Sequence, residues 1–437
     1  MSVNDTTNTL TARIIFGDNR NPQDEFVYTD LSELFPGYEF NEHGIDQSRY
    51  TGKIVSGKSI YRGEDPGEGG RVFAIPGMYE NVALLDVASM HPSSIILLNL
   101  FGDRYTKRYA DLKQARLYIK HGEYEKAAQL FDGKLAPYLT DPAMAKKLSN
   151  ALKIALNAVY GLTSAPFPNI FKDPRNKDNI VAKRGALFMI DLQKAVEAKG
   201  YTVAHVKTDS IKIPNADDEI ISFVMDFGKK YGYDFEHEAT YEKLCLVNEA
   251  VYIAKDASDG HWTAIGTQFQ VPYVFKTLFS HEDLEFWDMC ETKSVTTALY
   301  LDMNEGLPDC EMQEKELAKM KKRKKEYDKA GDGYPFGFEE EMAKLETEIA
   351  KCHNYIFIGK TGLFCPVKEG CGGGILVRQN NDGFASATGA KGWRWMEAEM
   401  VRDLGKEPDI DRSYYNRLVD EAVASISEYG DFEWFVS

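Results

Sequence analysis

The sequence lacks the segments that membrane and exported proteins need. It has no run of eighteen apolar residues, and its first twenty residues lack the charged-then-apolar order of a secretory signal. We therefore expect a cytoplasmic protein that does not engage a membrane. The 437 residues are 43% hydrophobic, which is ordinary for a globular chain and sufficient for two or three packed units.

Cysteine is scarce and widely spaced. The paired short spacings of a disulfide scaffold or a zinc ribbon are missing, so we expect reduced thiols. Two interpretations are open for the loose group formed by Cys352, His353, Cys365 and Cys371: thiols in a core, which we favour, or a metal site. The six cysteines are Cys245, Cys290, Cys310, Cys352, Cys365 and Cys371.

An excess of basic residues is also absent. The chain has 52 Lys and Arg against 68 Asp and Glu, a formal charge of -16. This balance disfavours a protein whose whole surface grips nucleic acid, although basic residues gathered along one cleft would still permit binding. The charged stretch from Glu311 to Lys351 predicts a helical arm, and its basic run Lys321–Lys325 fits either a DNA-backbone contact or a solvated helix face.

A strand that ends on a carboxylate is predicted near the start of the chain. Residues 1 to about 60 are polar and irregular, and glycines between Gly63 and Gly70 mark their boundary. The stretch Tyr79–Val87 then predicts a buried strand, in which the apolar run Val82–Leu85 is followed directly by Asp86. Pro92 suits the first turn of the helix that follows.

A helical hairpin is predicted over about residues 105–160, with breaks near Gly122 and Gly133. Asp141 can cap the second arm, and Pro142 suits its first turn. One side of this arm is apolar, and the other carries lysines, amides and a phenol at helical spacing. The second set is Lys146, Asn150, Lys153, Asn157 and Tyr160.

A second strand-end carboxylate follows. We expect a helix over Ile180–Ala198 and a strand over Thr202–Val206. Thr208 and Asp209 have the character of a tight turn, with residues 211–213 continuing on its far side. The sequence therefore predicts a β-hairpin with Asp209 at or near its tip.

Three segments carry a resemblance to a known family. Residues 86–93, DVASMHPS, resemble the DxxSLYPS motif of family B DNA polymerases. Residues 153–161, KIALNAVYG, are similar to its KxxxNSxYG motif, and residues 207–210, KTDS, look like its DTDS turn. Their order and their expected positions agree with that family, over roughly residues 60–280.

The resemblance implies a mixed α/β (α+β) fold with the right-hand architecture of polymerases. The palm would be an antiparallel sheet, the fingers a helical hairpin and the thumb mostly helical. The implied division is a lead-in segment (1–62), palm (63–103 and 163–265), fingers (104–162), and thumb with C-terminal region (266–437).

The resemblance also implies nucleotidyl transfer with two metal ions. Such ions, about 3.5–4 Å apart, clamp an in-line displacement at phosphorus. Asp86 and Asp209 are the expected catalytic carboxylates and metal ligands, and the Val87 carbonyl is a further ligand. We expect two Mg²⁺ ions, for which Mn²⁺ can substitute. Either aspartate alone would more commonly be a turn or helix cap.

Contacts with both substrates follow from the same resemblance. Basic residues would hold the triphosphate of a dNTP, and Asn157 and Tyr160 would line a pocket where shape selects the base pair. The implied nucleotide-binding residues are Ser89, Met90, His91, Arg116, Lys120, Lys153, Asn157 and Tyr160. The implied primer–template contacts are Gly69, Gly70, Gly161, Thr208 and Tyr252.

Several positions depart from the family's pattern. His91 stands where a tyrosine usually lies under the sugar, and Lys207 replaces the first aspartate of DTDS. Ala158 replaces the usual serine, and only Tyr252 matches the KKRY primer-binding motif. Gly67 occupies the tyrosine position of YxGG. Sugar discrimination and primer grip are therefore the least defined parts of the site.

The remaining features are less specific. Gly370–Gly374 has the character of a turn and not of a phosphate cradle. Phe432–Phe435 fits a packed terminal segment better than a clamp-binding tail. The DxE signature of an upstream exonuclease is not found, so a separate exonuclease chain, a longer protein and other replication proteins are all open. SMHPSS and YGLTSA are similar to bacteriophage replicative polymerases, which implies the host cytoplasm.

The leading hypothesis is a template-directed DNA polymerase that adds dNTPs to a primer 3′-hydroxyl. A first alternative is a catalytically weak accessory subunit that binds primer–template DNA, suggested by Lys207, the missing basic residues of the KKRY motif and the acidic balance. A second is a primer-making or RNA-templated polymerase, suggested by His91, because the palm architecture is shared among polymerases.

Overall fold

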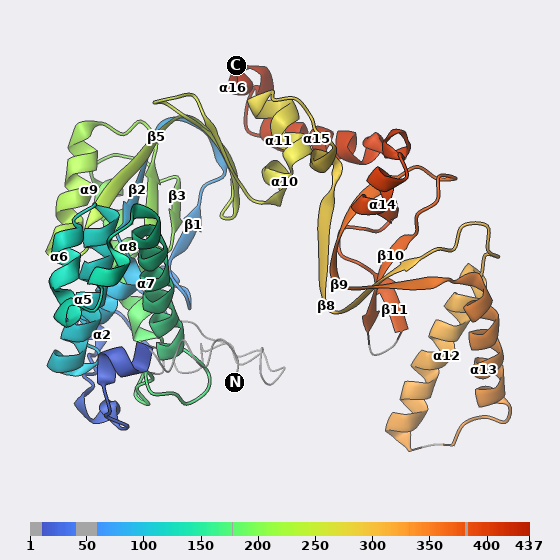
Figure 1. The fold of residues 1–437 in the computed structure, drawn as a ribbon, viewed down its shortest axis with the longest axis horizontal. Helices are drawn as coiled ribbons and strands as arrows, with labels where there is room; N and C mark the ends of the chain where they lie inside the picture. The colour runs from blue at the N-terminus through green and yellow to red at the C-terminus, as the bar shows by residue number, and fades with distance from the viewer. Residues whose placement is uncertain (1–10, 41–58, 177, 332, 381–382) are drawn as a thin grey trace. The chain divides into compact units, whose positions relative to one another are not determined.

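The computed structural model describes residues 11–40, 59–176, 178–331, 333–380 and 383–437 (Figure 1). The chain divides into two compact units, residues 1–263 and residues 264–437. Each unit has its own sheet and its own buried core. In the described ranges, no helix is long and apolar enough to cross a lipid bilayer.

The first unit is built on a seven-stranded sheet with the order β1-β3-β4-β2-β5-β6-β7. The strands are β1 Val72–Ala74, β2 Gly77–Val87, β3 His205–Lys207, β4 Ser210–Ile213, β5 Phe235–Asn248, β6 Val251–Asp256 and β7 Trp262–Ile265. The longer helices are α4 Met90–Leu97, α5 Gly102–Lys120, α6 Tyr124–Gln129, α7 Pro142–Thr163, α8 Ile180–Ala198 and α9 Asp218–Lys230. Short turns of helix are η1 Pro22–Glu25, α2 Leu31–Leu34, η3 Leu130–Gly133 and η4 Ala136–Tyr138.

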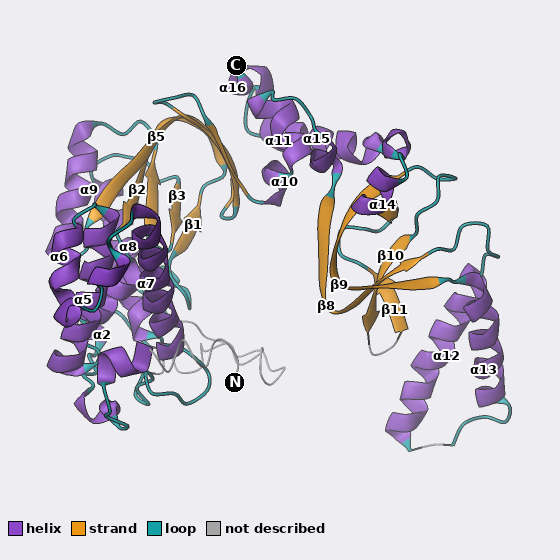
Figure 2. Cartoon of the chain, viewed as in Figure 1, coloured by secondary structure: helices purple, strands orange, loops and turns teal. Residues whose placement is uncertain are grey.

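Side-chain alternation decides which face of this sheet is covered. Ala83, Leu85 and Val87 of β2 are buried in one core with residues of α8 and α9, the helices drawn against the sheet in Figure 2. Because successive side chains of a strand point to opposite faces, Leu84 and Asp86 lie on the other face. The sequence therefore places its carboxylate on the face away from these two helices.

Most of the predicted elements of this unit are present. β2, α4, α8 and the α5–α7 hairpin lie where the apolar patterns place them, and the Asp141 side chain accepts from the Met144 amide at 3.1 Å. Leu152, Leu156 and Val159 are buried on the apolar side of α7. The expected Thr202–Val206 strand is wrong in its bounds, because the β3 pairs with β4 and β1 run from His205 to Lys207.

The expectation of an irregular lead-in segment is wrong for residues 11–40. Ile15, Phe16, Phe26, Leu31 and Phe35 are buried in the core of the first unit. These apolar residues lie in short segments separated by polar stretches, so no long periodic pattern marks them and their burial depends on tertiary contacts. Residues 1–10 and 41–58 lie outside the described ranges.

The second unit combines helices with a five-stranded antiparallel sheet of order β11-β10-β8-β9-β12. The strands are β8 Glu291–Asp302, β9 Tyr355–Val367, β10 Ile375–Asn380, β11 Gly383–Ser386 and β12 Arg394–Glu397. The helices are α10 Thr267–Gln270, α11 Pro272–Phe275, α12 Glu311–Ala330, α13 Phe338–Ile349, α14 Ala398–Asp403, α15 Arg412–Ser427 and α16 Phe432–Val436. Shorter turns are η5 Lys276–Ser280, η6 Phe286–Met289, η7 Ala350–Cys352 and η8 Glu407–Asp409.

This sheet was not predicted for the C-terminal region, which was expected to be mostly helical. Its strands pair across long stretches of sequence, for example Asp302 of β8 with Tyr355 of β9. The predicted helical arm is present as the α12–α13 pair, which lies side by side in Figure 1. Lys321 and Lys324 of the basic run form ion pairs with α13 residues at 3.5 and 3.6 Å.

The cysteines differ from expectation. Cys310 and Cys352 form a disulfide, so the prediction of reduced thiols is wrong for this pair. Cys310 directly precedes α12, and Cys352 follows shortly after α13. Because these two helices pack side by side as a hairpin, the two cysteines lie next to each other. In the described part of the chain, Cys352, His353, Cys365 and Cys371 do not form a cluster of metal-ligating side chains, and Cys365 Sγ lies 3.3 Å from Cys290 Sγ.

Two minor predictions are confirmed. Gly370–Gly374 forms the connection between β9 and β10 and contains a turn. The C-terminal segment is packed, since α16 follows α15 and Phe435 is fully buried.

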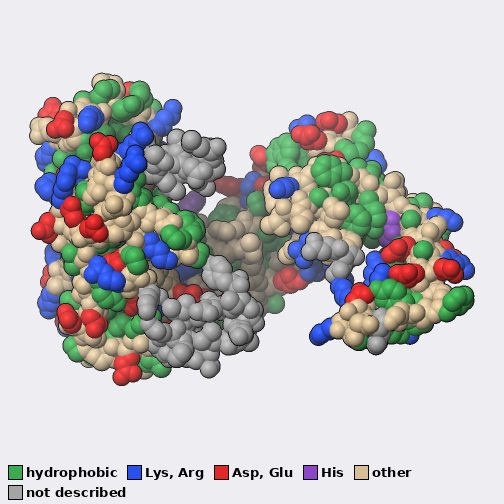
Figure 3. All heavy atoms as spheres, turned by 90° about the horizontal axis from the view of Figure 1, so that it is seen from below, with side chains coloured by type: hydrophobic (Ala, Val, Ile, Leu, Met, Phe, Trp, Pro, Cys, Tyr) green, Lys and Arg blue, Asp and Glu red, His purple; other side chains and the backbone are tan. Residues whose placement is uncertain are grey.

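The acidic excess is unequally divided. Residues 1–263 contain 31 Lys and Arg against 36 Asp and Glu, and residues 264–437 contain 21 against 32. The net charges are therefore -5 and -11. Figure 3 shows Lys and Arg interspersed with Asp and Glu on the faces turned to the viewer.

Candidate active site

Antiparallel pairing brings the two predicted carboxylates to neighbouring strands. Asp86 of β2 is opposite Ser210 of β4, and the Val87 amide donates to the Asp209 carbonyl oxygen at 2.8 Å. Asp209 lies in the turn between β3 and β4, where Thr208 has a left-handed backbone with φ 56°. Asp86 and Asp209 are therefore close together at the same end of the neighbouring strands β2 and β4, although they are far apart in sequence.

The environment of the pair disfavours two ionised carboxylates. Burial first, and then repulsion from Asp209, Glu238 and Glu236, raise the pKa of Asp86 to about 7, although Lys212 opposes the rise. The pKa of Asp209 is also raised, first by burial and then by Glu238. A divalent cation would relieve this repulsion, and carboxylate oxygens are the donors that Mg²⁺ and Mn²⁺ prefer.

The donor set in the structure is small. In the described part of the chain, no group of three or more His, Cys, Asp and Glu side chains forms a metal-binding cluster. The chemistry of the Asp86 and Asp209 oxygens fits hard divalent ions, and the Val87 carbonyl stays a predicted ligand.

Glu236 was not predicted and lies directly opposite Asp86 in the β2–β5 register. It also forms an ion pair with Lys120 of α5, with 3.2 Å between Nζ and Oε2. Sequence reasoning missed Glu236 because only the pairing of β2 with β5 brings it to Asp86. One of the predicted triphosphate-binding lysines is thus paired with a carboxylate of this sheet.

The α5 helix presents two more basic groups to the turn after β2 and to the first turn of α4. Arg116 Nη1 donates to Ser89 Oγ at 3.2 Å, and Lys113 Nζ donates to Ser93 Oγ at 2.7 Å. Lys113 was missed by sequence reasoning, although it lies three residues before Arg116 on the same helical face. The pKa of Lys113 is lowered, mainly because its ammonium group is buried.

The predicted nucleotide-binding residues of α7 differ in their surroundings. Tyr160 stacks on His91 of α4, with 3.8 Å between ring centroids and 10° between planes. Burial lowers the pKa of His91 to about 4, so this ring is neutral at pH 7. Lys153 and Asn157 are exposed on the same helix. The structure therefore joins His91 and Tyr160 directly and leaves the other two facing solvent.

Glycine allows a close approach between a loop and the Asp209 turn. A Cβ at Gly70 would lie 2.9 Å from Thr208 Cγ2, and φ at Gly70 is 144°. The Thr208 amide donates to the Arg71 carbonyl oxygen at 2.8 Å. Gly70 and Thr208, both predicted to contact DNA, are thus in contact. Gly69 lies in the same loop, and Gly161 is exposed.

Two predicted residues are largely buried. Met90 is 2% exposed, and its Sδ would lie 2.6 Å from a Cβ at Gly185 of α8, so its side chain packs against that helix. Tyr252 is 8% exposed. A nucleotide contact by Met90 and a DNA contact by Tyr252 stay predictions.

A buried lysine behind the carboxylates was also missed. Lys212 of β4 is 3% exposed, its Nζ donates to His205 Nδ1 at 3.1 Å, and its ammonium lies 4.6 Å from the Tyr252 ring centroid. Burial first, then Lys207, lowers the pKa of Lys212 to about 8. A lysine within a strand gives no sequence signal for such a position.

Several buried polar atoms near the stacked rings of His91 and Tyr160 have no hydrogen-bond partner among the described residues. Among the described residues, His91 Nδ1, Arg116 Nε and Asn179 Oδ1 are buried without a hydrogen-bond partner. Most buried polar groups in proteins are paired, and these three atoms belong to residues that the proposed nucleotide pocket brings near the two rings.

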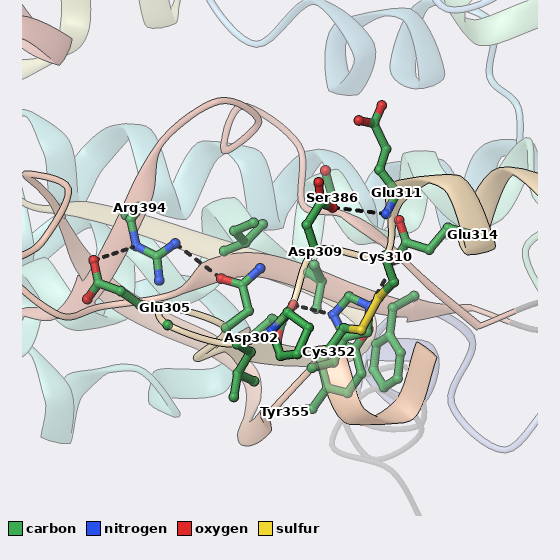
Figure 4. A pocket seen from close by; sticks show the side chains of 18 of the residues that line it. Asp302, Glu305, Asp309, Cys310, Glu311, Glu314, Cys352, Tyr355, Ser386 and Arg394 are labelled. Atoms are coloured by element: carbon green, nitrogen blue, oxygen red, sulfur yellow. Dashed lines mark hydrogen bonds and ion pairs between the residues drawn. A yellow bond between two sulfur atoms is a disulfide. The ribbon is translucent and has the colours of Figure 1, made fainter. Parts of the chain in front are cut away.

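A cavity of about 520 Å³ lies elsewhere, in the second unit (Figure 4). His353 lies at this cavity between two carboxylates, with Nδ1 2.6 Å from Asp302 Oδ2 and Nε2 2.9 Å from Glu314 Oε1. None of the predicted catalytic or substrate-binding residues lines it. Cavity size therefore does not locate the predicted chemistry.

Comparisons with known proteins give a partial match. Over 150 residues, 31% of this chain, the sequence is 32% identical to DNA polymerase II of Escherichia coli (strain K12). The matched part is 18% of that protein's length, so the chain spans less than a fifth of it. No family model matches the chain.

A solved structure with some similarity is the family B DNA polymerase from the hyperthermophilic archaeon Pyrobaculum calidifontis. The match has 15% sequence identity and a TM-score of 0.40, and covers 85% of this chain and 48% of that chain.

Proposed function

We propose that the chain is the polymerising part of a family B, template-directed DNA polymerase that adds dNTPs to a primer 3′-hydroxyl. The observation that carries this proposal is the meeting of Asp86 and Asp209 at the ends of neighbouring strands. Their raised pKa values agree with a site meant for cations. The partial identity to a DNA polymerase supports the same conclusion.

In this proposal Asp86 and Asp209 hold two divalent ions, Mg²⁺ or Mn²⁺. When bound, such ions activate the attacking hydroxyl and neutralise charge on the leaving group. Lys153 of α7 and Arg116 and Lys120 of α5 hold the triphosphate. Lys120 must leave Glu236 to do so.

The stacked rings of His91 and Tyr160 form one wall of the pocket for the sugar and the new base pair. A neutral His91 presents a flat ring without charge, so discrimination between sugars depends on the shape of the ring and on its free Nδ1. The Gly67–Gly70 loop and Thr208 face the primer–template. We place the enzyme in phage-type replication, with proofreading supplied by another chain or by a further part of a longer protein.

Primer extension with Mg²⁺ tests the proposal. Wild-type protein should extend a labelled primer on a DNA template, and Asp209→Asn should lower the rate by about a hundredfold or more, since metal-held charge stabilises the transition state by several kcal/mol. Asp226→Asn, at an exposed carboxylate of α9, is the matched control and should retain the wild-type rate. No extension by wild type, or equal extension by Asp209→Asn, contradicts the proposal.

The two alternatives predict different results in the same assay. An accessory subunit would bind primer–template without extending it with either Mg²⁺ or Mn²⁺. A primer-making or RNA-templated enzyme would use NTPs, or an RNA template, at least as well as dNTPs on DNA. The sequence identity to a DNA polymerase does not favour either alternative.

A further inference from the structure

Asn179 joins two parts of the proposed site. It immediately precedes α8 and has a left-handed backbone with φ 52°. Its Nδ2 donates to the Tyr160 hydroxyl at 3.3 Å and to the Glu68 carbonyl oxygen at 3.1 Å. One amide group therefore links the α7 helix to the loop that contains Gly67 and Gly70.

The same loop is held at two further points. Lys183 of α8, one helical turn after Asn179, donates from Nζ to the Gly67 carbonyl oxygen. At its other end, Gly70 packs against Thr208 in the turn that carries Asp209. A continuous set of contacts thus runs from Tyr160 through Asn179 and the loop to the turn that carries Asp209.

The other end of this set reaches the nucleotide pocket. Tyr160 stacks on His91, so a displaced Tyr160 hydroxyl would move the wall of the proposed pocket. Asn179 Oδ1 is buried and has no hydrogen-bond partner among the described residues. An amide with only a structural role usually has both of its groups paired. The Asn179 side chain therefore has an acceptor left over beside the two hydrogen bonds that it donates.

We propose that Asn179 is a positioning residue that fixes Tyr160 relative to the Gly67–Gly70 loop and, through Gly70, relative to Asp209. This inference rests on the proposed polymerase function. It predicts that Asn179 affects the use of the incoming nucleotide more than the turnover rate or the affinity for DNA.

The choice of residue is restricted by the backbone. Left-handed conformations are tolerated by glycine and, among other residues, mainly by asparagine and aspartate. Aspartate keeps the shape of the side chain but has no donor for the Glu68 carbonyl oxygen, and it can only accept from the Tyr160 hydroxyl. Glycine keeps the backbone conformation and removes the side chain without adding charge. An effect that both Asn179→Asp and Asn179→Gly show is therefore caused by loss of the amide donor. It cannot be caused by backbone strain, which neither variant adds, or by charge, which Asn179→Gly does not add.

The experiment measures KM for dNTP and kcat by primer extension, Kd for primer–template DNA, and the melting temperature. For both variants we expect KM to rise about three- to tenfold, the factor that corresponds to the loss of a hydrogen bond. We expect kcat and Kd to change less than twofold. Asn215→Gly is the matched control, because Asn215 also has φ 52° and its side chain is exposed.

A double-mutant cycle tests the link to Tyr160 itself. In a Tyr160→Phe background, Asn179→Gly should raise KM by a smaller factor than it does in wild type, because the shared hydrogen bond is already absent. Equal factors in the two backgrounds overturn the link.

Several outcomes overturn the inference while leaving the proposed function intact. The first is an unchanged KM for dNTP in both variants, and the second is a rise in KM in Asn179→Asp alone. The third is a lower melting temperature together with a rise in KM and a fall in kcat by the same factor. If wild-type protein extends no primer with Mg²⁺ or Mn²⁺, the proposed function fails and this inference fails with it. A rise in KM for both variants, with Asn215→Gly unchanged, supports the inference.

Discussion

The carboxyl group of Asp86 is surrounded by three other carboxylates and one buried ammonium. Asp209, Glu236 and Glu238 make its ionisation unfavourable, while Lys212 favours it. This repulsion makes the stability of the protein depend on pH. A second measurable property of a single residue concerns Lys153 and the use of nucleotide.

Asp86→Asn should reduce the dependence of stability on pH. The folded pKa of about 7 lies above the unfolded value of about 3.8, so Asp86 holds its proton in the folded state and releases it on unfolding in this window. The contribution of the protonated Asp86 side chain to the stability of the folded protein is full below pH 4 and is lost as pH rises to about 7. In EDTA at pH 8, the free energy of unfolding of Asp86→Asn should be about 1–3 kcal/mol higher than that of wild type.

Thermal melts from pH 4 to pH 8 measure this effect. The difference between Asp86→Asn and wild type should grow as pH rises, and Mg²⁺ should stabilise wild type but not the variant. Asp226→Asn provides the control for removing one surface charge. A constant difference across the pH range would contradict the repulsion at Asp86.

Lys153→Ala should weaken nucleotide use far more than DNA binding. A charged hydrogen bond to a phosphate contributes about 1.5–3 kcal/mol, so KM for dNTP should rise about tenfold or more. Lys147→Ala, an exposed lysine on the same helix, is the control and should behave as wild type. KM comes from primer extension and Kd from fluorescence anisotropy. Equal losses in KM and Kd would remove Lys153 from the triphosphate site.

At the scale of elements, local signals in the sequence located the strand β2, the helices α4, α7 and α8, and the turn at Asp209. Each has a pattern contained within a few residues: an apolar run, a capping aspartate, or a turn between short strands. The five-stranded sheet of the second unit has no such pattern. β8 and β9 pair across an inserted helical hairpin, and that register is a tertiary property.

The candidate site shows the same division. Asp86 and Asp209 were predictable because each lies at a strand end within a recognisable motif. Glu236, Lys212 and Asn179 were not, because β2–β5 pairing, burial under Tyr252 and contact with a distant loop give no local signal. The sequence therefore predicts the residues that lie within recognisable motifs, and it does not predict the residues that the fold brings around them.

The disulfide between Cys310 and Cys352 should stabilise the second unit by closing the α12–α13 hairpin. Crosslinking a loop of this length restricts the unfolded chain, so replacing both cysteines by serine should cost about 2–4 kcal/mol. Ellman's reagent in guanidinium should detect the four remaining thiols, Cys245, Cys290, Cys365 and Cys371, and all six cysteines after reduction. Cys371→Ser, at a half-buried free thiol, should leave the stability nearly unchanged. Six thiols without reductant would contradict the crosslink.

At the scale of the whole molecule, charge limits how the chain can bind DNA. The unit with all of the predicted site residues has a net charge of -5, and the other has -11. Neither has the basic excess that usually drives phosphate binding. Binding must therefore depend on a small number of local contacts, and the overall field of the molecule opposes approach of the DNA.

This balance predicts a moderate salt dependence. Each phosphate contact contributes a slope of about -0.9 to the plot of log K against log salt, so two to four contacts weaken primer–template binding about 10- to 150-fold between 50 and 200 mM NaCl. Anisotropy titrations at four salt concentrations give the slope. Lys153→Ala should leave it unchanged, because its proposed partner is the triphosphate and not the DNA backbone. A slope near zero would show that phosphates are not bound, and a Lys153→Ala slope smaller by about one contact would move this lysine to the DNA.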